Sequence, residues 1–133
     1  MGVTKHEGVQ APSYKEAEFT FEDLVSAGFV PAIDLPSDAE VIDGAMVITE
    51  AFDSETSDTG TVGDAETANR YKAGIDMTAL GTSKIAATGV LCNDSNRRQF
   101  GFSWTGVGEP PTEGKGKLWC LYIQKSRADF VQR

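Results

Sequence analysis

The sequence has few of the residue types on which most enzyme chemistry depends. Its 133 residues include one histidine, His6, and two cysteines, Cys92 and Cys120. A Ser-His-Asp triad needs a histidine that its neighbours hold in place, and His6 lies in an N-terminal stretch without apolar periodicity, so we expect it to be a solvated side chain. A zinc site needs four clustered ligands, whereas the two cysteines are far apart and neither belongs to a Cys-x-x-Cys pair. The composition therefore predicts no catalytic residue, no metal site and no cofactor.

Long hydrophobic runs are also missing. No apolar run approaches the roughly 20 residues that a membrane-spanning helix needs, and residues 1–7 contain no apolar signal segment. We therefore expect no membrane partner and no secretion. A chain that stays in a reducing cytosol is expected to keep Cys92 and Cys120 as free thiols, with a disulfide between them as the alternative.

Basic residues are scarce in the first half of the chain. The sequence has 12 Lys and Arg against 20 Asp and Glu, a formal net charge of −8. Such an acidic surface repels phosphate, which argues against nucleic acid as a partner. Residues 1–69 hold 2 basic and 15 acidic side chains, and residues 70–133 hold 10 basic and 5 acidic ones. This asymmetry either steers assembly with a charged partner or with copies of the chain, or is neutralised inside one fold.

The patterns that are present are mainly those of strands. No stretch keeps a 3.6-residue apolar period, and short β-favouring segments alternate with turns rich in Gly, Pro and Asp. This predicts a single-domain antiparallel β-sandwich or a jelly-roll-like barrel. We expect an extended N-terminal arm over residues 1–18 and the sandwich domain over residues 19–133. Strands are expected at residues 29–36, 40–52, 59–62, 84–92, 99–105 and 117–125.

Several of these segments carry more specific predictions. The prolines of residues 29–36 indicate an edge strand, and the doubly apolar residues 117–125 indicate a central one. Gly44 predicts a bulge or a close backbone approach within residues 40–52. Residues 59–62 are predicted to form a hairpin with that strand. Residues 21–28 fit either an extended segment or a short helix capped by Thr20.

Two groups of polar and glycine residues were considered as ligand sites. The acidic loop residues Asp53, Glu55, Asp58 and Asp64 offer oxygens to a cation, but their spacing lacks the calcium-loop order, which favours a solvated hairpin tip. The glycine-rich residues 106–108 are followed by prolines where a phosphate loop needs a helix, and residues 114–116 lack the Walker spacing. Both glycine segments are therefore predicted to be turns.

Aromatic residues concentrate in the last third of the chain. In residues 99–105 the aromatic positions alternate and so share one face. The aromatic side chains either belong to the core, which we favour, or line a groove for a sugar or peptide. A hydrolase built on two carboxylates stays open as well, because nothing in the sequence selects a pair. The aromatic residues concerned are Phe100, Phe102, Trp104, Trp119 and Tyr122.

Residues 35–64 resemble a known family. A Leu35-Pro36 pair precedes a Val-rich strand, then Phe52-Asp53-Ser54, then Ser57-Asp58-Thr59 and Val62-Gly63-Asp64, and Arg70-Tyr71 follows. This order resembles that of the capsid decoration, or cement, proteins of tailed bacteriophages. It covers about a third of the chain and is a pattern of turns and strands rather than a catalytic signature.

The resemblance implies a structural role. It implies a β-rich virion protein, made in the host cytoplasm, that binds the outer surface of a phage capsid and stabilises it by bridging subunits of the major capsid protein. It also implies no enzymatic activity. We expect a homo-oligomer, with a trimer favoured over a dimer, and we expect the N-terminal arm to contact a neighbouring subunit. The alternative is a sugar- or peptide-binding sandwich of a phage tail or surface structure.

Overall fold

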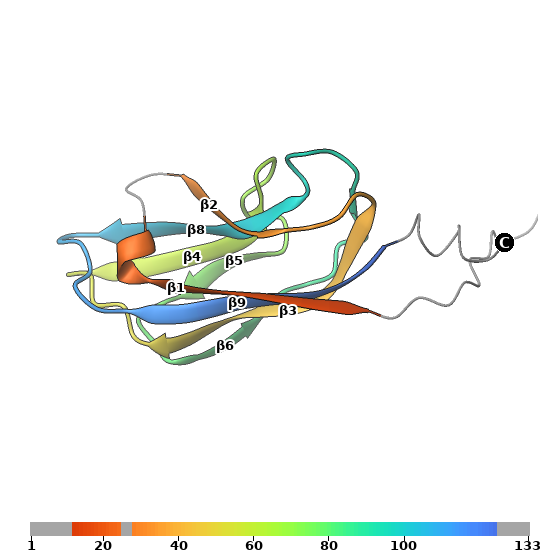
Figure 1. Ribbon diagram of the computed structural model, residues 1–133. Coiled ribbons are helices and arrows are strands. Elements are labelled where there is room, and N and C mark those ends of the chain that lie inside the picture. Colours follow the sequence, from red (N-terminus) through yellow and green to blue (C-terminus); the bar gives the residue numbers. More distant parts are fainter. Residues whose placement is uncertain (1–11, 25–27, 125–133) are drawn as a thin grey trace, which may run out of the picture.

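Two antiparallel sheets pack face to face in the computed structural model, which describes residues 12–24 and 28–124 (Figure 1). The first sheet has the order β1 (Ser13–Thr20), β9 (Lys115–Gln124), β3 (Ala39–Glu50) and β6 (Gly81–Lys84), and β7 (Leu91–Cys92) also pairs with β3. The second has the order β2 (Phe29–Asp34), β8 (Gln99–Val107), β4 (Ser57–Asp64) and β5 (Lys72–Asp76). Because the two sheets share no strand within the described residues, the predicted sandwich is confirmed and the barrel is not.

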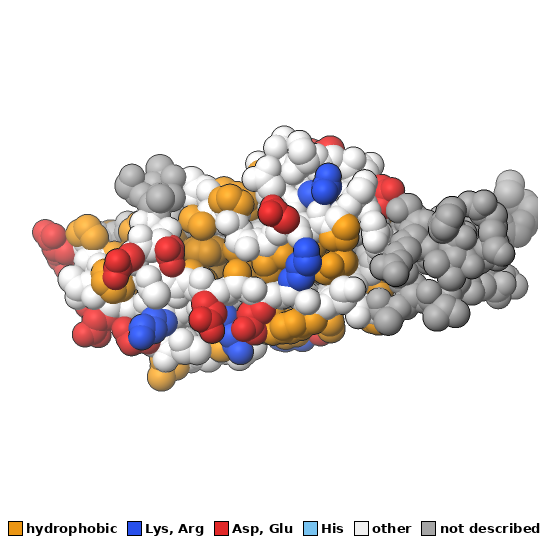
Figure 2. All heavy atoms as spheres, viewed as in Figure 1, with side chains coloured by type: hydrophobic (Ala, Val, Ile, Leu, Met, Phe, Trp, Pro, Cys, Tyr) orange, Lys and Arg blue, Asp and Glu red, His pale blue; other side chains and the backbone are white. Residues whose placement is uncertain are grey.

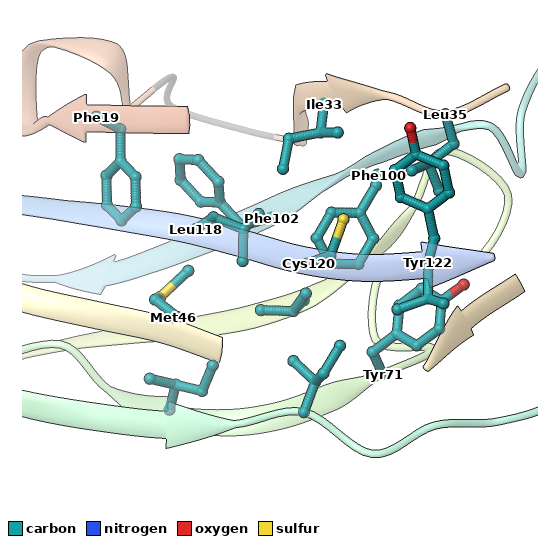
Figure 3. Packing of buried hydrophobic residues seen from close by; sticks show 14 of the residues in the cluster. Phe19, Ile33, Leu35, Met46, Tyr71, Phe100, Phe102, Leu118, Cys120 and Tyr122 are labelled. Carbon is teal, nitrogen blue, oxygen red and sulfur yellow. The ribbon is translucent and has the colours of Figure 1, made fainter. Parts of the chain in front are cut away.

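The core lies between the two sheets and takes alternate side chains from each strand. Leu118, Cys120 and Tyr122 point inward from β9, while Phe100 and Phe102 point inward from β8 (Figure 3). This alternation is the period-2 pattern of a strand with one face on a core. The prediction that Phe100 and Phe102 share one buried face is therefore confirmed.

The central strand of the first sheet is β9, as residues 117–125 predicted. It pairs with β1 on one side and with β3 on the other. β3 approaches β9 so closely at Gly44 that a Cβ atom at this position would lie 2.6 Å from the carbonyl oxygen of Trp119. The register between β3 and β9 also shifts just before this point, between Val41 and Asp43. Gly44 thus marks both the bulge and the close approach that its position in the sequence predicted.

The hairpin predicted for residues 59–62 is wrong. These residues belong to β4, which pairs with β8 and β5 in the second sheet and not with β3. β3 already has β9 along one edge and β6 and β7 along the other. The chain therefore crosses between sheets at residues 51–56, where the buried Phe52 donates its backbone N–H to the carbonyl of Met77.

The predicted arm does not extend to residue 18. Residues 13–20 form β1, an edge strand paired along its full length with β9. Phe19 is buried there, and the centroid of its ring lies 4.4 Å from the ring centroid of Phe102 in the opposite sheet. The side chains of β1 that point away from the core are mostly polar, so the sequence did not indicate a strand here. Residues 1–11 lie outside the described residues.

Two further segments differ from the sequence prediction. Residues 84–92 are not one continuous strand: β6 and β7 both run antiparallel to β3, and between them Ala86 donates its N–H to the carbonyl of Tyr71. Residues 21–23 form one 3-10 turn, η1 (Phe21–Asp23), capped by Thr20. The capped-helix alternative is thus correct for this turn, while residues 25–27 lie outside the described residues.

Candidate interaction surface on the first sheet

The acidic residues considered as a cation site are engaged by donors of the protein itself. Asp58 is 1% exposed and accepts hydrogen bonds from the backbone N–H and hydroxyl of Ser54 and from Nε1 of Trp104. Asp64 is buried, pairs with the Arg70 guanidinium and accepts two backbone N–H groups. Among the described residues no three His, Cys, Asp or Glu side chains gather where they could hold a metal ion. These carboxylates therefore close loops.

Acidic side chains accept hydrogen bonds from several backbone amides of the glycine-rich loop between β8 and β9. Asp53 accepts the backbone N–H groups of Thr112 and Glu113, and Glu50 accepts that of Gly114. Gly114 itself has φ +144°, and a side chain there would lie 2.4 Å from the ring of Phe52. A residue with a Cβ would be strained at that φ and would collide with the ring. The prediction that both segments are turns is wrong for most of their residues: Gly106 and Val107 belong to β8, Lys115 and Gly116 belong to β9, and Gly108 and Gly114 lie in the loop between them.

The two cysteines are free thiols, as predicted, and both are buried. Burial raises the pKa of Cys120 to about 12 and also raises the pKa of Cys92. The thiolate is the reactive and metal-binding form of cysteine, so neither residue is prepared to act as a nucleophile or ligand. His6, the remaining candidate, lies outside the described residues.

The five aromatic residues considered as a groove are separated by the fold. Phe100, Phe102 and Tyr122 are buried in the core. Trp104 packs partly buried against the same core with its Nε1 on Asp58, while Trp119 lies on the outside of the other sheet. No common groove can therefore include these five side chains.

The outward side of the first sheet is the most aromatic outer surface in the described structure. We call it the outer face and define it by residues that the strand register places on the side away from the core. The pairing of β1, β9 and β3 brings Tyr14 opposite Leu121 and Glu16 opposite Trp119, with Asp43 and Lys84 further along the same rows. Its members are Tyr14, Glu16, Asp43, Val47, Lys84, Lys117, Trp119, Leu121 and Ile123.

Trp119 organises the outer face. The Tyr14 ring stacks on it with a centroid distance of 5.7 Å, and Nζ of Lys84 lies 5.3 Å from its ring centroid. Nζ of Lys84 also lies 2.6 Å from Oδ1 of Asp43. The indole is thus held between an aromatic ring and a cation.

Charged groups tie the aromatic residues of the outer face to one another. The Tyr14 hydroxyl donates to Glu16, which raises the pKa of Tyr14 and lowers that of Glu16. The hydrogen bond from Lys84, followed by that from the Gly44 N–H, lowers the pKa of Asp43. Lys117 lies 3.6 Å from Glu16. Because Lys84–Asp43 and Lys117–Glu16 join the two halves of the sequence, part of the charge asymmetry is neutralised within the fold.

The outer face has the composition of a protein-binding surface. Tyr14 is 54% exposed, and Trp119, Leu121 and Ile123 are half-buried. Tyrosine and tryptophan, flanked by aliphatic residues, are the side chains that most often dominate binding between proteins. The sequence analysis missed Tyr14 because it placed this residue in the arm. The alternation of Tyr14, Glu16 and Glu18 with Ala17 and Phe19 is the signal that identifies the strand.

Comparison with known proteins gives structural matches only. No protein family and no curated protein matches the sequence, and no helix of the described residues is long and apolar enough to span a membrane. A chain of the "Cyanophage Pam1 capsid asymmetric unit" is similar, with a TM-score of 0.59 and 16% identity over 92% of this chain and 91% of that one.

A second match comes from another phage. A chain of the "Acidic stable capsid structure of Helicobacter pylori bacteriophage KHP30" has a TM-score of 0.62 and 19% identity, over 88% of this chain and 91% of that one. The two similarities extend over nearly the full length of all three chains. The sandwich described above is therefore a fold that occurs in chains of phage capsids.

Proposed function

We propose that this chain is a capsid decoration protein that binds the exterior of a phage shell and stabilises it by bridging subunits of the major capsid protein. The observation that carries this proposal is the near-complete coverage in both directions of chains from two phage capsids. Those chains are nearly as long as this one. The similarity therefore concerns a whole small capsid chain and not a domain inside a longer one.

The outer face supplies the binding surface for this role. Tyr14 and Trp119 form its centre, and Leu121 and Ile123 extend it along β9. A rigid sheet holds these residues, so little conformational entropy is lost when they bind. A shell repeats its subunits many times, and a homo-oligomer, which we propose to be a trimer, would gain from the resulting effective concentration. Each single contact with the shell can then be modest.

The sugar- or peptide-binding alternative loses its main support. It required the aromatic residues of β8 and β9 to share a groove, and the structure divides them between the core and the outer face. Binding to a shell would instead use Tyr14 and Trp119, the aromatic residues of the outer face.

The proposal is tested by mixing the purified chain with expanded and unexpanded shells of the phage and measuring retention by co-sedimentation. We expect retention on one form and a loss of at least about tenfold in affinity for Trp119→Ala, because removing a central aromatic anchor commonly costs 2 kcal/mol or more. Leu80→Ala is the matched control, since Leu80 is 67% exposed and lies outside the outer face. If neither the expanded nor the unexpanded shell retained the chain, the proposal would be contradicted.

A further inference from the structure

An open groove runs along the seam between the two sheets, where edge strands β1 and β2 face each other. It has a volume of about 270 Å³, and its apolar wall includes Phe19, Val30 and Phe102. Figure 2 shows hydrophobic side chains exposed along this seam, with acidic side chains close by. We call it the seam groove. The residues that line it are Ala17, Glu18, Phe19, Asp23, Val30, Pro31, Ala32 and Phe102.

Two contacts flank the seam groove. Nζ of Lys15 on β1 donates to the carbonyl of Asp34 at the end of β2, with a distance of 2.7 Å. Toward the other end, the η1 turn is held by a capping box between Thr20 and Asp23.

β1 offers a better edge for strand pairing than β2. In the described structure β1 pairs only with β9, and residues 13–20 contain no proline, so the other edge of β1 keeps its backbone donors and acceptors. β2 contains Pro31, which has no N–H, and its register is interrupted between Pro31 and Ile33. Proline and bulges are the features that block an edge against further pairing. A strand that enters the groove would therefore pair with β1.

The charge around the groove favours a basic strand. β1 and η1 together carry Glu16, Glu18, Glu22 and Asp23 against the single cation Lys15. Residues 125–133 carry the opposite balance, with Lys125, Arg127 and Arg133 against Asp129, and include the aromatic Phe130. Opposite charges of this kind select a partner and its orientation.

The order of these residues also matches the faces of β1. Side chains alternate in a strand, so Lys125, Arg127, Asp129 and Arg133 fall on one side, with a net charge of +2, and Phe130 falls on the other. On β1, the side chains of Glu16 and Glu18 point away from the core, with Glu18 also at the rim of the groove, while Ala17 and Phe19 line its wall. One register therefore places the basic residues beside the glutamates and Phe130 in the groove.

The apolar wall of the groove at Phe19 is out of reach for Phe130 of the same chain. Phe19 pairs with Gly116 of β9, which is eight residues before Gln124. At the rise per residue of a strand, Gln124 is therefore about 27 Å from the level of Phe19. Six fully extended residues from Gln124 to Phe130 reach at most about 22 Å. Figure 1 shows η1 and the end of β9 at opposite ends of the sheet. Phe130 must therefore come from a second copy.

We propose that residues 125–133 of one copy pair with the free edge of β1 in a second copy and place Phe130 in the seam groove. This contact is heterologous, because a terminal segment of one copy meets the groove of the next. Such a contact closes into a ring when the rotation between copies allows it. It needs no capsid subunit, so self-association is measured with the purified chain alone and its failure is distinguishable from a failure of the proposed decoration role.

The test compares the full chain with five variants by sedimentation velocity, at protein concentrations up to the millimolar range that linked neighbouring sites reach. Glu18→Arg alters the groove side, and Arg127→Glu alters the segment. We expect each to weaken self-association at least about fivefold, because an attractive charge pair becomes repulsive. Glu109→Arg is the control, since it makes the same charge change in a loop that does not line the groove.

The double variant with Glu18→Arg and Arg127→Glu decides between a direct contact and a general charge effect. We expect it to recover most of the wild-type association, because the exchanged charges attract again. Phe130→Ala is expected to abolish association while leaving the far-UV spectrum unchanged. A wild-type chain that stays monomeric, or a double variant no better than the single variants, would overturn the proposal.

Discussion

At the residue scale, buried carboxylates explain why a cation site was a plausible hypothesis and why it does not form. Asp58 is buried, yet three donors surround it, two from Ser54 and one from Trp104. Together they hold the loop that precedes β4 to strand β8. Asp58 is therefore a polar anchor in the core. Its carboxylate oxygens are satisfied by hydrogen-bond donors of the protein.

We predict that Asp58→Ala destabilises the fold by about 3 kcal/mol, because it leaves the donors of Ser54 and Trp104 buried without an acceptor. Urea unfolding monitored by tryptophan fluorescence measures this change. Asp53→Ala is the control: its carboxylate accepts from Thr112 and Glu113 at an exposed loop, so we expect a loss of about 1 kcal/mol. Equal losses in the two variants would contradict the anchoring role.

The acidic residues themselves were visible in the sequence, but their donors were not. Ser54 is close to Asp58 in the chain, whereas Trp104 comes from a strand that pairs with β4 only after folding. Tyr14 and Lys84 were missed for the same reason, since their relation to Trp119 depends on the order of strands in the sheet. Local patterns predict which residues face a core, and pairing decides which ones meet.

At the element scale, the strands with strong apolar alternation were predictable and the weak ones were not. β3, β8 and β9 supply half of the buried hydrophobic residues and were located from their patterns. β1 has one large inward side chain, Phe19, among polar residues, so it was assigned to an arm. β6 and β7 both pair with β3 but are separated by a break that contains Gly89, whose positive φ of 74° interrupts the strand predicted over residues 84–92. Tertiary pairing rather than local preference creates these edge strands.

The position of β1 changes the expected effect of an N-terminal deletion. Removal of residues 1–18 takes away most of β1 and leaves β9 without a partner on that side, so we predict a loss of about 3 kcal/mol or more in unfolding free energy. Removal of residues 1–11 keeps the whole of β1 and is predicted to cost under about 1 kcal/mol. Thermal unfolding of both truncated chains checks this. Similar losses would show that β1 contributes little.

At the scale of the whole molecule, the fold presents two separate surfaces. The outer face presents Tyr14 and Trp119 on a rigid sheet, and the seam groove lies at the edge where β1 and β2 meet. The fold class was predictable from the sequence, because alternating short strands and turns are a property of the whole chain. The outer face and the seam groove were not predictable, because each combines residues from strands that are distant in the sequence.

The central claim is that this chain binds the outside of a phage shell, and imaging of shells incubated with the purified protein by electron cryomicroscopy tests it most directly. The account predicts added density on the outer surface that fits the sandwich, spans neighbouring capsid subunits and turns Tyr14 and Trp119 toward the shell. Shells that carry no added density, or that carry it on the inner surface, would contradict the account.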